Sequence, residues 1–194
     1  MKSQKSKIKF SERYTFRVTP FATRGFTLLE ALVSIFILTF TIVAPMSIAS
    51  STLFNSTVAK DQVTAFYLAQ EAIEGVRSIR DGNILANPQN RWLQGLPLAT
   101  NFTIDTVNWA SGRPRISTAN CPSGICVPLK YDSTGHLYQY STGSNTNFIR
   151  TVQLTGIDDP VSPQREVAIR VTVKWNVGKI ERTFIARENM LNWQ

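Results

Sequence analysis

Apolar residues are distributed unevenly along this chain, and the longest apolar run covers residues 26–49. The run contains a single charged residue, Glu30, and no lysine or arginine. As a helix it would be about 36 Å long at roughly 1.5 Å per residue, which exceeds a bilayer hydrocarbon core of about 30 Å. Because backbone groups inside a bilayer must be hydrogen-bonded within the segment, the run predicts a membrane-spanning helix.

A second pattern, over residues 60–80, predicts an amphipathic continuation of this helix. Its apolar positions recur every three or four residues, which is the spacing of one helix face. They are Val63, Phe66, Ala69, Ile73 and Val76. The polar run 81–83 predicts the end of the helix. We therefore expect a membrane half at 26–50 and an amphipathic half at 51–82, with Glu71 and Glu74 on its solvated face.

Strand patterns dominate the remainder, residues 83–194. Residues 167–175 alternate strictly between apolar and polar, as in a strand with one buried face. Further candidates are residues 102–108, 127–131, 136–140, 148–155 and 180–187. Turn-forming residues lie at 132–135 and 177–179, and 83–112 is expected to be a connecting region. The predicted fold class is α+β, with an antiparallel meander packed on the second half of the helix.

Charge is concentrated at the N-terminus. The 194-residue chain has 21 basic and 13 acidic residues, a net charge of +8, and residues 1–25 hold seven of the basic residues and one acid. Basic residues before an apolar span place the N-terminus in the cytoplasm and the residues beyond 50 outside the membrane. The remainder carries only +2, which argues against a basic nucleic-acid-binding domain.

Three interpretations of this N-terminus compete. A secretory signal peptide has an apolar core of roughly 7–15 residues and a small-x-small cleavage site. Residues 47–49 resemble such a site, but the apolar run is too long and contains an acid. A plain membrane anchor fits the length but leaves Glu30 unexplained, and an acid in an apolar span is a functional hypothesis by default.

The third interpretation accounts for the whole junction. The residues Arg24-Gly25-Phe26-Thr27-Leu28-Leu29-Glu30 follow a basic leader and open the apolar run. This arrangement resembles the processing site of type IV prepilins and type II secretion pseudopilins, and residues 67–77 resemble the corresponding segment of minor-pilin-like members. The resemblance covers residues 1–80 in sequence and implies a pilin-like fold for the rest.

The resemblance implies a maturation and assembly route. A prepilin peptidase/methylase would cut after Gly25, remove leader 1–25 and methylate the new terminus at Phe26. Glu30 would then pair with the Phe26 amine of a neighbouring subunit and set the register; within one helix the same two groups are four residues apart. The implied partners are other pilin or pseudopilin subunits, an inner-membrane assembly platform and membrane lipid.

The resemblance thus predicts a structural subunit of a pilus or pseudopilus, with a periplasmic or extracellular domain at residues 83–194. The alternative is an uncleaved single-pass membrane protein whose β-rich ectodomain binds a ligand or partner. We expect no enzyme activity, because the sequence has one histidine and lacks phosphate-loop and hydrolase motifs. We expect no cofactor, no metal site and no clear nucleic-acid site.

The two cysteines, Cys121 and Cys126, are separated by four residues. An exported domain lies in a compartment where disulfides persist, which favours a bond between them. Two free thiols are the alternative.

Overall fold

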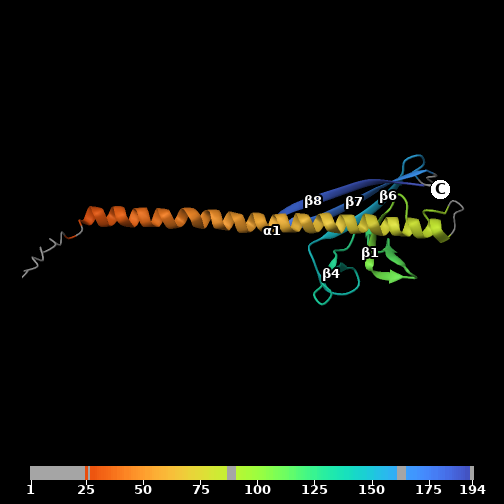
Figure 1. Ribbon diagram of the computed structural model, residues 1–194, viewed down its shortest axis with the longest axis horizontal. Coiled ribbons are helices and arrows are strands. Elements are labelled where there is room, and N and C mark those ends of the chain that lie inside the picture. Colours follow the sequence, from red (N-terminus) through yellow and green to blue (C-terminus); the bar gives the residue numbers. More distant parts are fainter. Residues whose placement is uncertain (1–24, 26, 87–90, 161–164, 193–194) are drawn as a thin grey trace, which may run out of the picture. The chain divides into compact units, whose positions relative to one another are not determined.

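The computed structural model describes residues 25, 27–86, 91–160 and 165–192. The chain divides into two compact units, Met1–Ala49 and Ser50–Gln194. A single helix, α1 (Leu28–Ala86), contributes to both, and the strands belong to the second unit (Figure 1). The strands are β1 (Asn101–Ala110), β2 (Arg113–Ser117), β3 (Lys130–Asp132), β4 (Leu137–Gln139), β5 (Ser144–Asn145), β6 (Ile149–Gly156), β7 (Glu166–Val177) and β8 (Ile180–Leu191). The predicted α+β class is confirmed.

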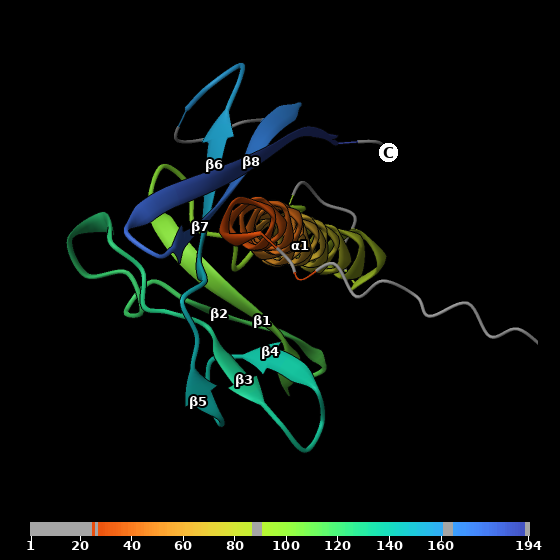
Figure 2. The same ribbon diagram turned by 90° about the vertical axis from the view of Figure 1, so that its left-hand side faces the viewer.

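The strands form two antiparallel sheets rather than the one meander that the sequence predicts. The main sheet has the order β2-β1-β6-β7-β8 and the smaller one the order β4-β3-β5. The small sheet is inserted between β2 and β6, so β1 pairs with β6 across a long stretch of sequence (Figure 2). The meander prediction holds for β6, β7 and β8 but not for the whole sheet, because sequential strand patterns do not show that β1 becomes a neighbour of β6. The expected connecting region, 83–112, contains β1 and hence part of the main sheet.

The predicted hairpins are confirmed with small changes in their bounds. In β7 the odd-numbered residues from 167 to 177 are buried and the even-numbered residues are more exposed, as the alternation predicts. The β7–β8 hairpin closes at the pair Val177↔Ile180. Gly178 has a positive φ of 62°, a conformation that glycine adopts without steric cost. In the small sheet, Tyr131 pairs with Tyr138 across the predicted turn.

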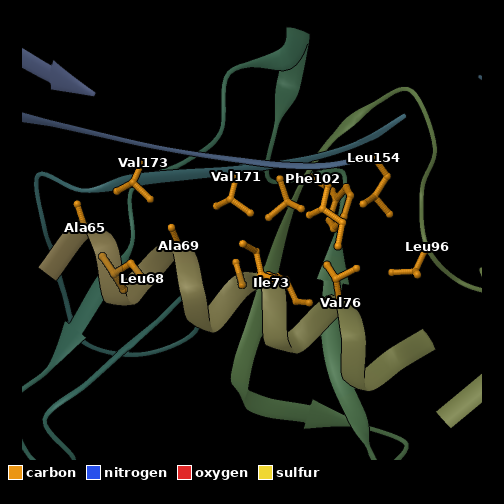
Figure 3. Packing of buried hydrophobic residues seen from close by; sticks show 14 of the residues in the cluster. Ala65, Leu68, Ala69, Ile73, Val76, Leu96, Phe102, Leu154, Val171 and Val173 are labelled. Carbon is orange, nitrogen blue, oxygen red and sulfur yellow. The ribbon is translucent and has the colours of Figure 1, made fainter. Parts of the chain in front are cut away.

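The helix packs on the main sheet through a face lined by small residues. The fully or nearly fully buried positions are spaced three or four apart; they are Ala65, Leu68, Ala69, Ala72, Ile73, Val76 and Ile79. Opposite them lie Phe102, Leu154, Val171 and Val173 (Figure 3). Alanines at this contact let the helix backbone approach the sheet, and the larger neighbours fill the remaining space.

The predicted stripe is therefore shifted around the helix. Ala69, Ile73 and Val76 are buried as expected, but Val63 and Phe66 are 54% and 50% exposed. Phe66 lies at the margin of the contact, where its ring meets Phe184 of β8 edge-on at a centroid distance of 5.9 Å. The buried face therefore combines three alanines with larger aliphatic residues, and it is centred on positions 65, 69, 72 and 76.

The predicted helix end at 81–83 was also wrong, because α1 continues to Ala86. Asn83 is 3% exposed and its side-chain amide donates hydrogen bonds to the carbonyls of Trp92 (3.0 Å) and Gln94 (2.8 Å). Its amide oxygen accepts a hydrogen bond from Arg113. These bonds to β2 and to the segment before β1 satisfy a residue that otherwise favours turns.

Gly75 marks the closest approach of α1 to β1 and gives a direct test of this packing. A Cβ at Gly75 would lie 2.9 Å from the side chains of both Ile104 and Thr106, whereas one at Gly82, also in α1, would meet nothing within 4 Å. Gly82→Ala should raise the free energy of unfolding by roughly 0.5–1 kcal/mol through helix propensity. Gly75→Ala should lower it, because overpacking costs about 1–3 kcal/mol.

Urea titration of the detergent-solubilised chain, followed by tryptophan fluorescence, measures both changes. Equal stabilisation by the two alanines would contradict the tight contact at Gly75.

Candidate functional site

The predicted processing and assembly residues lie at the start of α1. Gly25 is exposed, and a Cβ there would meet nothing within 4 Å. Glu30 lies in the first turn of α1 and is exposed. Phe26 and leader residues 1–24 lie outside the described residues. The chain thus presents an unhindered glycine five residues before an acid at the beginning of a helix.

Thr27 caps the beginning of this helix, a feature that the sequence interpretation missed. The Glu30 backbone N–H donates to the Thr27 hydroxyl at 3.3 Å, and the Ala31 N–H donates to the Thr27 carbonyl at 3.1 Å. Thr27 and Glu30 have the spacing of a capping box, which was readable in the sequence. An acid in the first turn also lies near the positive end of the helix dipole. Glu30 therefore has a local role besides any role in assembly.

The first part of α1 exposes its apolar side chains on all sides. Between residues 28 and 48 the large apolar side chains range from 46% exposed at Val33 to 84% at Leu28. Such a surface is unfavourable in water and is satisfied by lipid or by apolar protein. In the described part of the chain, α1 is the one helix long and apolar enough to cross a membrane.

The hydroxyl groups in this apolar part are satisfied within the helix. Ser34 donates to the Glu30 carbonyl at 2.7 Å, Thr39 to the Phe36 carbonyl at 2.9 Å and Thr41 to the Ile37 carbonyl at 2.8 Å. Hydrogen bonds of this kind hide a polar group from a surrounding apolar medium. Serine and threonine are thus compatible with insertion of this segment into a bilayer.

The same segment has one face of small and polar residues, which we call the small-residue face. Its members are Thr27, Glu30, Ala31 and Ser34 in the first two turns; further along, the large side chain of Leu38 lies on the same side, next to Thr41. Thr27, Ser34 and Thr41 are seven residues apart, so each is displaced by only about 20° around the helix from the one before. Small residues of this kind let apolar helices approach one another closely in a bilayer.

The opposite face of the segment is bulky. It carries Leu29, Val33, Phe36 and Phe40, and the rings of the last two are stacked with centroids 6.4 Å apart. The segment is therefore two-sided: one face allows close helix packing, and the other presents large side chains.

A second polar cluster lies inside the helix–sheet contact of the second unit. Arg150 of β6 is fully buried and donates to the carbonyls of Leu68 in α1 (3.0 Å) and Ile104 in β1 (2.5 Å). Its guanidinium lies 3.3 Å from the carboxylate of Glu71 and 5.8 Å from the centre of the Tyr140 ring. The Glu71 carboxylate also accepts a hydrogen bond from the Thr106 hydroxyl. This cluster joins α1, β1 and β6.

Electrostatic interactions in the cluster keep the Arg150 guanidinium charged. Burial by itself lowers the pKa of Arg150, but Tyr140 and Glu71 outweigh it and the pKa is raised, so the guanidinium stays charged. Burial raises the pKa of Tyr140, and its neutral hydroxyl donates to the Arg150 carbonyl at 3.2 Å. The charged guanidinium and the neutral Tyr140 hydroxyl therefore hold the cluster together and stabilise the fold.

The expectation that Glu71 lies on a solvated face was wrong, because Glu71 pairs with Arg150. Glu74 does lie on the exposed side, where it pairs with Arg77 at 2.8 Å. The signal for the buried pair was present in the strand pattern 148–155. Arg150 has the same parity as Phe148, Val152 and Leu154, which places a charged residue on the buried face of the strand.

The cysteine prediction agrees with the structure. The sulfur atoms of Cys121 and Cys126 are at disulfide-bond distance, 1.98 Å. The bond closes the loop around the short 3-10 turn η1 (Pro122–Gly124), between β2 and β3.

Comparison with protein-family models, curated proteins and solved structures finds no match to this chain. Its own features define a class of α+β chain with one long N-terminal helix. The first part of this helix is apolar enough to cross a membrane, and the second part packs on an antiparallel sheet.

Arg150 provides the test of the buried cluster. Arg150→Met keeps much of the side-chain length but leaves Glu71 and two backbone carbonyls without their partner, so we expect a loss of about 3–5 kcal/mol in the free energy of unfolding. Urea titration of the detergent-solubilised chain measures this loss in the free energy of unfolding. The matched control is Arg170→Met on the exposed face of β7, which should change stability by less than about 0.5 kcal/mol. Similar effects of the two substitutions would contradict a stabilising role for the Arg150 cluster.

Proposed function

We propose that this protein is a structural subunit, of the minor kind, of a type IV pilus or a type II secretion pseudopilus. The observation that carries the proposal is the junction Arg24-Gly25-Phe26-Thr27-Leu28-Leu29-Glu30 at the start of an exposed apolar helix. The basic leader, the glycine, the aromatic residue and the acid each match the prepilin pattern. The packing of the second part of α1 on an antiparallel sheet supports the proposal, since pilins share that arrangement.

In this proposal the protein is inserted with its N-terminus in the cytoplasm and residues beyond 50 outside the membrane. A prepilin peptidase/methylase cuts after Gly25 and methylates Phe26. The subunit then leaves the bilayer for a filament through an assembly platform, exchanging lipid around its apolar helix for the helices of other subunits. The two-sided character of residues 27–34 supports this exchange, because the small-residue face suits close helix–helix contact.

The proposal gives Glu30 two separable roles. As a first-turn acid it supports the beginning of α1, together with the Thr27 cap. As a charged group in an apolar environment it requires a cation, and the amine created at Phe26 is the nearest one that processing supplies. Only the second role links one subunit to another.

Processing is tested by the intact mass of the membrane-extracted protein from cells with and without an active prepilin peptidase. We expect the 194-residue chain to become 169 residues, the full length less the 25-residue leader, with a methylated N-terminal phenylalanine. Gly25→Val should block the cut without disturbing the chain's own fold, because no atom lies within 4 Å of the new side chain's Cβ. An uncut chain in the presence of active peptidase would support the alternative, a single-pass protein with a ligand-binding ectodomain.

Assembly is tested by three substitutions at the start of α1. Glu30→Gln keeps a side chain that suits a capping box but removes the charge, and we expect at least about a tenfold loss of subunit from sheared filaments because an unpaired amine in an apolar environment is costly. Glu30→Ala also removes the charge and should lower incorporation to a similar extent. Thr27→Ala, the matched control, removes the cap bond and keeps the charge, so incorporation should persist.

Immunoblots of the filament and membrane fractions give, for each variant, the ratio of subunit in filaments to subunit left in the membrane. Normal incorporation of Glu30→Gln, with loss only in Glu30→Ala and Thr27→Ala, would show that Glu30 acts through helix capping and not through a charge pair.

A further inference from the structure

The main sheet has a second face, turned away from α1, that is partly open to solvent. Side chains on adjacent positions of a strand point to opposite faces, so this outer face carries the residues that alternate with the buried ones. On β6, β7 and β8 they include Thr151, Gln153, Arg170, Thr172, Lys174 and Arg187. The same face also carries Glu166, Glu181 and the exposed Ile185, so its basic character is local to Arg170 and Arg187.

Two arginines face one another on this outer face, next to the β8 edge of the sheet. Arg170 of β7 and Arg187 of β8 are direct cross-strand partners, and both are exposed. Like charges at directly opposite positions destabilise a sheet. Within the described residues neither guanidinium has an acidic partner, whereas Lys174 on the same strand pairs with Glu181 at 3.0 Å. The arrangement leaves uncompensated positive charge where a bound anion would relieve the repulsion.

A crevice of about 200 Å³ lies beside Arg170, between the open face and the disulfide loop. Its lining side chains are amides, hydroxyls and cations: Asn101, Thr151, Gln153, Arg170, Thr172 and Lys174. Gly124 of the disulfide loop lies at the rim of the crevice, and its carbonyl accepts a hydrogen bond from the Asn101 amide at 2.8 Å. The disulfide between Cys121 and Cys126 closes the loop that carries this rim. A loop held in place in this way loses little conformational freedom when a ligand binds.

The chemistry of the lining selects the ligand. Amide and hydroxyl side chains donate and accept hydrogen bonds, as sugar hydroxyls do, and the cations match an acidic substituent. Neither a carboxylate nor an aromatic ring lies among the lining residues, so the crevice has no platform on which a nucleic-acid base would stack.

We propose that this crevice binds an acidic oligosaccharide, with Arg170 contacting the acidic group and Thr151, Gln153 and Thr172 contacting sugar hydroxyls. Arg187, across from Arg170, adds positive charge at the edge of the site. All the lining residues belong to the second unit, so binding can be measured on the uncleaved, unassembled chain.

Fluorescence anisotropy of a labelled oligogalacturonate, titrated with the detergent-solubilised full chain, tests the proposal. We expect saturable binding that an unlabelled neutral dextran oligosaccharide does not compete for. Arg170→Gln should weaken binding by about tenfold or more, which corresponds to the loss of one charged hydrogen bond. Thr172→Val, which has a similar shape but lacks the hydroxyl, should weaken it severalfold.

The matched control is Arg182→Gln. Arg182 is exposed on β8 but has the opposite strand parity from Arg187, so it lies off the outer face. Its loss removes the same charge and should leave affinity unchanged. Equal weakening by Arg170→Gln and Arg182→Gln, tighter binding of a short duplex DNA than of the oligogalacturonate, or equal competition by inorganic phosphate would each overturn the proposal. A thermal melt of each variant verifies that the fold is retained.

Discussion

The globular part of this protein depends on one interaction, the bond network of Arg150 inside the contact between helix and sheet. Its guanidinium reaches a carbonyl of α1, a carbonyl of β1 and the carboxylate of Glu71 from a position on β6 with no solvent exposure. A buried charge is tolerated only when it is paired and hydrogen-bonded. The elements that supply those partners are therefore fixed relative to one another, and the alanine-lined face of α1 packs around them.

The helix itself has two parts in different environments. Within the second unit its small residues are buried against the sheet, and their exact size matters because Gly75 and Ala69 leave room for β1 and its neighbours. Within the first unit its large apolar side chains have no covering protein and require lipid or other helices. One helix serves both parts, since a helix satisfies its backbone whatever surrounds it, although Pro45 interrupts the ladder by lacking an N–H.

Sequence patterns were most informative where one physical period dominates. The alternation at 167–175 predicted β7 and its buried face, and the apolar run predicted the exposed helix. They were least informative at helix–sheet contacts. Val63 and Phe66 fit an apolar stripe but lie at its margin, and Asn83 fits a turn but is held within α1 by Trp92, Gln94 and Arg113. In each case a tertiary partner outweighed the local preference.

The sequence by itself determined the long helix, the strands other than β2 and β5, the charge asymmetry and the junction at Gly25 and Glu30. These depend on neighbouring residues and on the contrast between water and an apolar medium. Only the tertiary structure decided that β1 pairs with β6, that Glu71 and Arg150 meet, and that Arg170 and Arg187 lie side by side. These contacts join residues far apart along the chain, and their energies depend on burial and on partners that no local pattern records.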